Sequence, residues 1–428
     1  MQTNALLKEL FQSALDGIDP RKIVSEYCFL KGSTLSVHGD SYELSSYEKV
    51  YVLGSGKAAW SMAAGAEKLL GDFVHSGLVV SPLCTEELKK ITCLESDHPI
   101  PTQRSIEGGE ALAKMMQGCT KRDLFIFLLS GGSSALVELP VEGISLEDLQ
   151  EATDIMLKHA LSIDEINVIR KHLSRLKGGR LGAMNEAQGL VLTISDVIGD
   201  DLYSIGSAPL YADRSSFSDA MDILRKYEIL EQMPKGVCNA LKEGSEHLRL
   251  ETPKQPCESI RHYILASNDL AKEAVRKRAL SLGEEARVIK EAFCKDVKTA
   301  AEKIIDTAYS SPEKIIVFGG ETTVRVTGKG RGGRNQQLVL LMLKLAIEKG
   351  LRFSFLSAGT DGIDGNSDAA GAFFDARSLK EHKQRINDID AYLLNNDAYH
   401  FFKPLDSLLM TGPTGTNVMD IAILIKEF

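Results

Sequence analysis

Short, almost wholly apolar runs alternate with longer segments of helical period along the first half of the chain. Strands that helices cover on both faces lack polar positions, so these runs predict buried strands. Their alternation with helical segments is typical of βαβ units and predicts an α/β fold. The predicted strands lie at 51–56, 77–82, 91–96, 124–131 and 189–196, and two of the predicted helices at 57–70 and 107–118.

A second α/β series follows a charged stretch at residues 235–259 that contains Pro253 and Pro256. The later part of this stretch has no sustained strand or helix period, so we place the domain boundary within it. We expect one domain at residues 1–245 and another at 246–428. The predicted strands of the second domain lie at 261–267, 285–292, 314–322, 353–359, 370–375, 407–412 and 421–426, and its helices at 268–282, 296–310 and 335–349.

Composition narrows the classes of protein. Of 428 residues, 43% are hydrophobic and 25% charged, which is ordinary for a globular protein. The 50 basic and 59 acidic residues leave a charge of −9, so we expect no nucleic-acid partner. No apolar run approaches the ~18 residues of a membrane helix, and Lys8 and Glu9 interrupt the amino-terminal apolar positions. We therefore expect a cytoplasmic protein without a membrane partner.

The seven cysteines form an odd, scattered set without a C-x-x-C pair. This pattern indicates neither a disulfide framework nor a structural zinc site. We expect free thiols in a reducing compartment.

A glycine-rich turn follows the first predicted strand: Gly54, Ser55 and Gly56 precede Lys57, which opens a helix. Backbone N–H groups and the positive helix end can meet an anion there. The turn is not a Walker A loop, but it fits the G-x-G-x-x-A dinucleotide fingerprint. That fingerprint requires an acidic residue after the next strand, where this chain has none before Glu86. We favour an anion site over a merely tight turn.

Two further strand ends carry hydroxyl, glycine and carboxylate groups. Open α/β sheets bind ligands at the carboxyl ends of their strands, so the donors of an SGGSS turn could hold a ligand there, and the ligand that we expect is a nucleotide phosphate. Asp196 ends the next strand, where it could bind Mg²⁺ or accept a hydroxyl proton. A flexible loop and a turn-capping aspartate are equally open alternatives. The turn comprises Ser130, Gly131, Gly132, Ser133 and Ser134.

A basic segment, INVIRKHLSRLKGGRLGA, covers residues 166–183. It could line an anionic ligand site, but a basic helical face is more often solvated surface, and we favour that interpretation.

The densest pattern is GKGRGGRNQ, where four glycines interleave three basic residues that end at Arg334. A flexible loop that carries guanidinium groups into a helix amino terminus suits a phosphoryl group. We expect Gly332 and Gly333 to bind nucleotide phosphate, and Arg331 and Asn335 to bind substrate.

Two loops complete the candidates. Asp361 lies in a glycine-rich acidic loop that lacks the calcium-loop pattern, so Mg²⁺ fits it better than Ca²⁺. Thr414, Gly415 and Thr416 follow another strand, and we expect them at the nucleotide phosphates. Cations at glycine-rich strand ends, acidic loops and hydroxyl-rich turns together match phosphoryl transfer.

The chain resembles the glycerate 2-kinase family, whose carboxyl-terminal part is called the MOFRL domain. The resemblance spans nearly the whole chain and departs at residues 207–210, where this chain reads SAPL and the family usually reads SGPT. It rests on the ordered motifs GSGKAA, DHPIP, SGGSSAL, INVIRKHLSRLKGGRL, SDVIGDD, ASNDLA, GGETTV, GRGGRNQ, GTDGIDG, DAAGA, NDAYHFF and TGPTGTNVMD.

The resemblance implies ATP-dependent phosphorylation of D-glycerate at its 2-hydroxyl, giving 2-phosphoglycerate and ADP with Mg²⁺. It implies a larger, Rossmann-like three-layer amino-terminal domain, a smaller carboxyl-terminal domain with a mixed sheet, and an active site in the cleft between them. By resemblance, Lys57 and Arg334 are catalytic.

Our hypothesis is that these two cations and Mg²⁺ neutralise the γ-phosphoryl oxygens while Asp196 accepts or orients the hydroxyl proton. Asp196 and Asp361 are the candidate metal ligands. We expect a monomer or homodimer. Two alternatives remain: an NAD(P)H-dependent hydroxypyruvate reductase, and a sugar-acid binding protein without catalysis.

Overall fold

The computed structural model describes residues 3–379 and 386–427, which form two compact units. One unit is Pro20–Leu265, and the other joins Met1–Asp19 to Ala266–Phe428. The boundary therefore falls twenty residues after the expected position at 245/246, and the first nineteen residues belong with the second unit. The physical reason is β9 (Ile260–Ala266), which follows the proline-containing stretch and extends the first sheet at its edge.

The first unit is built on a six-stranded sheet in the order β6-β5-β4-β7-β8-β9, whose first five strands run parallel. All seven residues of β7 are buried, as expected for a central strand. These strands are β4 (Val50–Ser55), β5 (Val74–Ser81), β6 (Ile91–Glu95), β7 (Leu124–Ser130) and β8 (Gln188–Ile194).

Helices cover both faces of this sheet. The chain moves outward from β4 to β5 through α3 (Ala59–Leu70) and back from β6 to β7 through α4 (Gln103–Gly118). Right-handed crossovers in opposite directions place these helices on opposite faces. Phe125 and Phe127 share one buried cluster with Leu112 of α4. The predicted three-layer α/β fold of this unit is confirmed.

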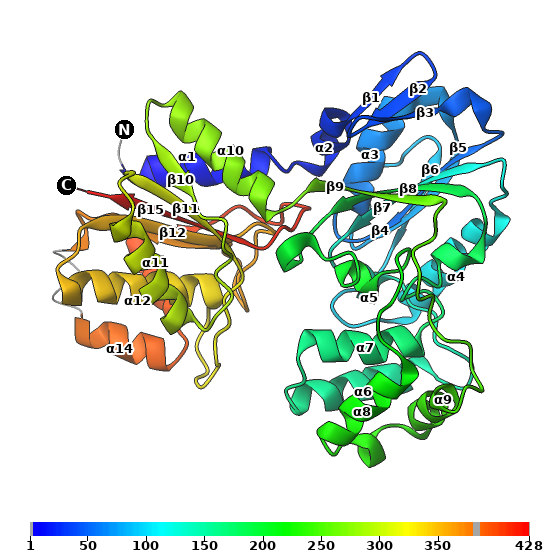
Figure 1. The fold of residues 1–428 in the computed structure, drawn as a ribbon. Coiled ribbons are helices and arrows are strands. Elements are labelled where there is room, and N and C mark those ends of the chain that lie inside the picture. The colour runs from blue at the N-terminus through cyan, green and yellow to red at the C-terminus, as the bar shows by residue number, and fades with distance from the viewer. Residues whose placement is uncertain (1–2, 380–385, 428) are drawn as a thin grey trace. The chain divides into compact units, whose positions relative to one another are not determined.

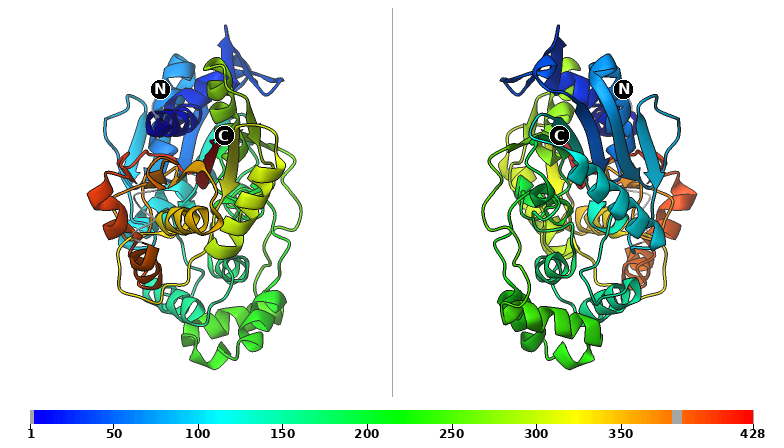
Figure 2. Two further views of the ribbon diagram at one scale, coloured as in Figure 1. Left: turned by 90° about the vertical axis from the view of Figure 1, so that its left-hand side faces the viewer. Right: turned by 90° about the vertical axis from the view of Figure 1, so that its right-hand side faces the viewer.

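Two additions to this unit were not predicted. Four helices form a lobe with its own apolar core, and a small antiparallel sheet lies at the other end of the unit (Figures 1 and 2). The lobe consists of α6 (Leu146–Lys158), α7 (Ile163–Leu173), α8 (Phe217–Lys226) and α9 (Lys235–Ser245), and the small sheet of β1 (Cys28–Lys31), β2 (Thr34–Val37) and β3 (Asp40–Glu43). The remaining helices of the unit are α2 (Pro20–Tyr27) and α5 (Ser133–Leu136).

The second unit has a mixed six-stranded sheet in the order β10-β11-β15-β12-β13-β14. Among the strands that the structure describes here, only the β10–β11 pair is parallel; β15 pairs antiparallel with both β11 and β12. The mixed sheet expected for the carboxyl-terminal part is thus confirmed. Its strands are β10 (Ala286–Val288), β11 (Ile315–Gly320), β12 (Phe353–Gly359), β13 (Gly371–Phe374), β14 (Leu408–Leu409) and β15 (Asp420–Lys426).

Helices pack on both faces of the second sheet, with α1 and α10 on one side and α11 and α12 on the other (Figure 1). The α11–α12 side forms one large apolar cluster that includes Phe353 and Phe355. The helices are α1 (Thr3–Asp16), α10 (Asn268–Ser281), α11 (Val297–Ser310), α12 (Arg334–Lys349), α14 (Ile386–Leu394) and α15 (Ala398–Phe402).

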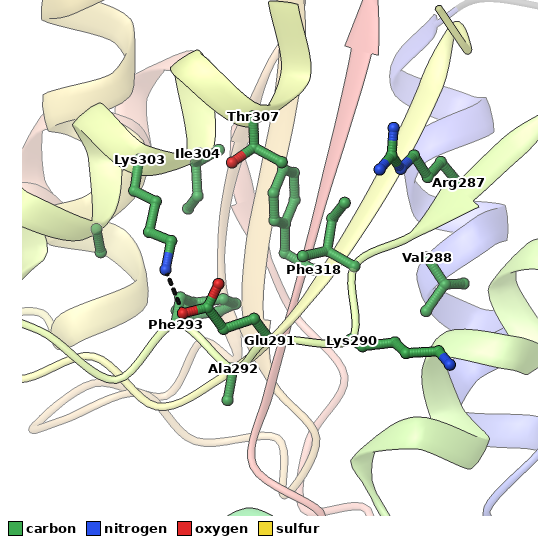
Figure 3. Close-up of a pocket in the computed structure, with 12 residues that line it drawn as sticks. Arg287, Val288, Lys290, Glu291, Ala292, Phe293, Lys303, Ile304, Thr307 and Phe318 are labelled. Atoms are coloured by element: carbon green, nitrogen blue, oxygen red, sulfur yellow. Dashed lines mark ion pairs between the residues drawn. The ribbon is translucent and has the colours of Figure 1, made fainter. Parts of the chain in front are cut away.

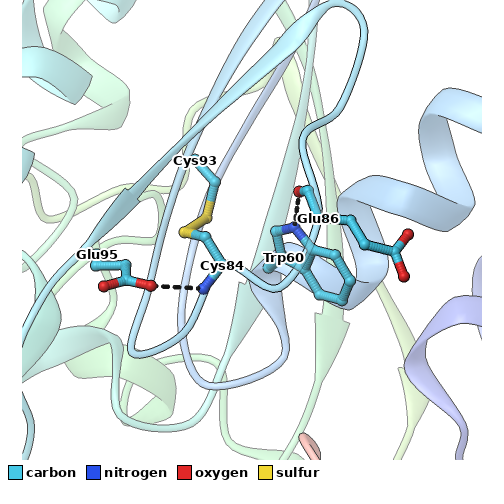
Figure 4. The surroundings of a disulfide bond; sticks show 5 residues. All are labelled: Trp60, Cys84, Glu86, Cys93 and Glu95. Atoms are coloured by element: carbon cyan, nitrogen blue, oxygen red, sulfur yellow. Dashed lines mark hydrogen bonds between the residues drawn. A yellow bond between two sulfur atoms is a disulfide. The ribbon is translucent and has the colours of Figure 1, made fainter.

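Cys84 and Cys93 form a disulfide, which corrects the expectation that all thiols are free (Figure 4). Cys93 lies on β6, beside β5, and Cys84 lies in the loop that joins these two strands. The Cys84 backbone N–H donates to Glu95 Oε1 at 3.1 Å, which also holds this loop on β6. A pair nine residues apart matches no standard spacing motif, so only the strand pairing reveals it.

No helix in the described part of the chain has both the length and the apolar character that crossing a bilayer requires.

Candidate active site

Three neighbouring strands of the first sheet carry predicted site residues just after their carboxyl ends. β4, β7 and β8 are parallel neighbours, so their carboxyl ends lie together. The Lys57 backbone N–H donates to the Gly131 carbonyl at 2.8 Å, and the Ala58 N–H donates to Ser130 Oγ at 3.0 Å. Gly56 lies so close to Ser130 that a side chain at Gly56 would overlap it. The turn after β4 is therefore fixed against the turn after β7.

Lys57, Asp196 and His98 gather around the glycine pair after β7. A Cβ at Gly131 would overlap the Asp196 carboxylate, and a Cβ at Gly132 would lie 3.2 Å from Lys57 Cγ and 3.0 Å from His98 Cδ2. A cation, a carboxylate and an imidazole thus flank one glycine turn. His98 was not among the predicted site residues, because a lone histidine in a loop is more often structural.

The serine hydroxyls of these turns point inward rather than towards a ligand. Ser55, Ser130 and Ser133 are each no more than 2% exposed. Ser55 Oγ and Ser133 Oγ are 2.5 Å apart and tie β4 to the turn after β7. The expected phosphate contacts of this turn are therefore left to its backbone N–H groups and to the half-buried Ser134.

The turn that departs from the family pattern is buried as well. Ala208 has a φ of 55°, in the left-handed region where glycine is favoured, which accounts for the glycine usual there. The Ser207 and Ala208 carbonyls accept the N–H groups of Gly178 and Gly179 at 3.0 and 2.7 Å. This departure therefore affects internal packing rather than an exposed surface.

The prediction that the basic segment before that turn is solvated surface is wrong for most of it: among its basic side chains only Arg175 is exposed. Lys171 is buried and pairs with Asp213 at 3.1 Å, and Lys177 is buried in an ion pair with Glu138. Burial lowers the pKa of Lys177, and Glu138 opposes that change. These lysines join segments within the unit, because a buried charge requires a partner.

In the second unit, Arg334 begins α12 and is held by two carboxylates. Its Nε and Nη2 donate to Asp420 at 2.6 and 2.9 Å, and its Nη1 lies 2.7 Å from Glu321. Burial lowers the Arg334 pKa, but the hydrogen bonds and charges of these partners outweigh burial and raise it. A guanidinium has five N–H donors, so at most two remain for a ligand. Sequence patterns gave no sign of either partner.

Asp364, from the acidic loop after β12, caps the amino terminus of α12. This carboxylate accepts the N–H groups of Asn335 and Gln336 at 3.1 and 2.8 Å, and burial raises its pKa to about 6. Asn335, expected to bind substrate, is only 1% exposed and accepts the Ser357 hydroxyl at 2.5 Å. In this structure Asn335 therefore supports the helix start instead of facing a ligand.

Arg331 and the turn at Thr414 lie in the same unit, and both make contacts with other residues of that unit. Arg331 lies over the Tyr399 ring at 4.0 Å and donates to Asp368 at 2.9 Å. Thr414 Oγ1 donates to the Thr360 carbonyl at 2.6 Å, which ties the 411–417 turn to the acidic loop. Both are thus built into the loops that surround the start of α12.

The candidate metal ligands lie in different units, Asp196 in the first and Asp361 in the second. The described residues include no group of three or more His, Cys, Asp or Glu side chains placed to hold a metal ion. A magnesium ion that accompanies a nucleotide takes one or two carboxylates together with phosphate oxygens and water, so single carboxylates at strand ends still fit it.

A cavity of about 470 Å³ lies within the second unit at the amino terminus of α12. Gly332, Gly333 and Arg334 line it, together with Thr322. Thr322 Oγ1 is buried and has no hydrogen-bond partner among the described residues. Buried hydroxyls are nearly always paired, so this one is an exception within the lining of the cavity.

Another cavity of the same unit, about 480 Å³, lies beside β10 and α11 (Figure 3). Phe318 and Ile304 give it apolar walls, and Lys303 reaches towards Glu291 at 2.6 Å. None of the residues predicted to carry chemistry lines it, so the cavity at α12 is the candidate site of this unit.

Known proteins resemble the chain over almost its whole length. Residues 6–242 match a domain of unknown function (DUF4147), and residues 314–420 match the MOFRL family. Glycerate 2-kinase of Pyrococcus horikoshii is 37% identical over 97% of this chain and 96% of its own. D-glycerate 2-kinase of Thermotoga maritima is 37% identical over 88% and 90%. A crystal structure of glycerate kinase from Thermotoga maritima superposes with a TM-score of 0.84, at 33% identity, covering 99% of both chains.

One relative bears on the reductase alternative. A protein of Agrobacterium vitis named putative hydroxypyruvate reductase is 35% identical over 87% of this chain and 86% of its own. Other relatives are nevertheless named glycerate kinase or glycerate 2-kinase. The MOFRL domain that the resemblance predicts is also found, in the carboxyl-terminal part of the chain. The chain belongs to the glycerate 2-kinase family.

Proposed function

We propose that this protein transfers the γ-phosphoryl group of ATP to the 2-hydroxyl of D-glycerate, giving 2-phosphoglycerate and ADP. The observation that carries the proposal is the gathering of Lys57 and Asp196 around the glycine turn after β7. A cation can neutralise phosphoryl oxygens there, a carboxylate can take a proton, and backbone N–H groups can hold phosphate. Relatives of nearly equal length that are named glycerate 2-kinase support the choice of substrate.

In this proposal Lys57 stabilises the charge of the transferred phosphoryl group, and Asp196 accepts or orients the proton of the attacking hydroxyl. Arg334 is the second cation for the phosphoryl oxygens, held in orientation by Asp420. Each unit offers one carboxylate that would hold Mg²⁺, Asp196 in the first and Asp361 in the second. When bound, the ion supplies charge neutralisation on the nucleotide phosphates. Glycerate and ATP are then the expected partners, and a cytoplasmic location with a monomeric or dimeric state remains part of the proposal.

The reductase alternative is disfavoured by the end of β5. A dinucleotide site of this type uses an acidic residue there to hold the ribose, and residues 74–85 contain none.

Turnover tests the proposal directly. The purified protein is incubated with glycerate, ATP and Mg²⁺, and the product is assigned by phosphorus NMR. We expect 2-phosphoglycerate, and we expect Lys57→Ala to lower kcat on the order of 10²-fold because a charge that stabilises the transition state is lost. Lys121→Ala, at an exposed lysine that pairs with Glu186, is the matched control and should leave kcat unchanged.

Three results would contradict the proposal. Near-normal turnover of Lys57→Ala would remove that lysine from the mechanism. Oxidation of NADH or NADPH with hydroxypyruvate, without ADP release from ATP, would establish the reductase. Glycerate binding without any turnover would favour a binding protein.

A further inference from the structure

Five consecutive backbone N–H groups of the glycine-rich loop, residues 327–331, donate to one short segment, residues 395–397. This segment joins α14 to α15. Asn396 Oδ1 accepts two of the five, so one side-chain oxygen fixes two successive peptide groups. The donor and acceptor pairs are Thr327 N to Asn396 Oδ1 (2.7 Å), Gly328 N to Asn396 Oδ1 (3.0 Å), Lys329 N to Asn395 Oδ1 (3.2 Å), Gly330 N to the Asn395 carbonyl (2.9 Å) and Arg331 N to Asp397 Oδ1 (2.9 Å).

The contact is close as well as polar. A Cβ at Gly328 would overlap the Asn395 backbone, and one at Gly330 would overlap Asp397. The loop therefore lies directly on the segment and is not the flexible loop that its glycines predict. These two glycines serve close packing.

Asn396 has a conformation that suits this role. Its φ is 53°, in the left-handed region that asparagine tolerates better than most residues. Strained backbone of this kind persists where surrounding contacts stabilise it. Here the side chain makes four hydrogen bonds: Oδ1 also accepts the Thr327 hydroxyl at 3.3 Å, and Nδ2 donates to the Arg325 carbonyl at 3.4 Å. Asn396 also lines the 470 Å³ cavity together with Gly332 and Arg334.

We propose that Asn396, with Asn395 and Asp397, is a positioning element that holds the glycine-rich loop in the conformation that receives the ATP phosphates. The proposal rests on the proposed kinase function for the identity of the ligand. None of the three side chains needs to contact the phosphates. They act by fixing backbone that leads into Gly332, Gly333 and the start of α12.

Substitution of Asn396 tests this with two readouts. Asn396→Gly keeps the left-handed backbone accessible but removes the acceptor, whereas Asn396→Asp keeps an acceptor. Asp406→Gly is the control, since Asp406 is exposed and also has a left-handed φ of 51°. Hydrogen exchange of the full-length protein is measured for the peptide containing Thr327 and Gly328, and steady-state kinetics are measured for both substrates.

We expect faster exchange at residues 327–328 in Asn396→Gly, and wild-type exchange there in Asn396→Asp and Asp406→Gly. We expect the KM for ATP to rise about tenfold in Asn396→Gly, with the KM for glycerate and kcat changed less than about twofold. A merely structural role would lower kcat and thermal stability without this split.

Two results would overturn the inference: unchanged exchange in Asn396→Gly, or faster exchange with an unchanged KM for ATP. If the wild-type protein shows no ATP-dependent turnover, the proposed function fails and with it the assignment of ATP as the ligand. The exchange measurement would still decide whether Asn396 holds the loop.

Discussion

At Gly131 the absence of a side chain lets a carboxylate approach the end of β7. A Cβ there would overlap Asp196, yet Gly131 does not adopt the left-handed backbone that disfavours other residues. The glycine is therefore required by Asp196 and not by its own conformation. Substituting it displaces the carboxylate while leaving the strand intact.

We predict that Gly131→Ala lowers kcat by about 10- to 100-fold, as expected when a group that handles the proton is misplaced. The unfolding midpoint should change little, because a side-chain carboxylate can move aside. Gly118→Ala is the matched control: a Cβ at Gly118 meets nothing, and alanine favours the end of α4. Equal kcat in both variants would show that Asp196 has no part in catalysis.

Among whole elements, those with strong periodicity were predicted within a few residues. Helices expected at 268–282, 296–310 and 335–349 occur at 268–281, 297–310 and 334–349. The strands β1–β3 were missed because each has only four residues, too few for a clear period, and because β3 is mostly polar and buries a single residue. Site residues were predicted where glycines and charged residues lie close together in the sequence. Partners from distant parts of the chain, such as Asp420 at the start of β15 for Arg334, carry no local signal.

The cap of α12 is such a partner, and it predicts a pH dependence. Burial raises the pKa of Asp364 from 3.8 to about 6, so the folded protein keeps a proton that the unfolded chain releases. The contribution of Asp364 to stability should therefore fall as pH rises from about 4 to about 6, by about 3 kcal/mol, and level off above. Urea unfolding of the wild type and Asp364→Asn between pH 4 and 7 measures it. Parallel pH profiles would contradict this prediction.

In the whole molecule, the chain begins and ends in the same unit. Residues 20–265 form one compact unit that is inserted, along the chain, between α1 and the rest of the second unit. The sequence did not reveal this, because the apolar face of an amphipathic helix does not specify which sheet it covers. Contacts of α1 with α10, β12 and β15 assign it to the second unit.

Truncating a buried side chain of α1 should therefore destabilise the second unit, most of which lies at residues 266–428. Phe11 is 1% exposed, and we predict that Phe11→Ala lowers the unfolding free energy of the second unit by about 3–5 kcal/mol. Hydrogen exchange should accelerate in residues 266–428 and stay unchanged in residues 20–265, since separate units can unfold in separate transitions. Gln12→Ala, on the exposed face of the same helix, should change neither. Faster exchange confined to residues 20–265 would contradict the assignment of α1 to the second unit.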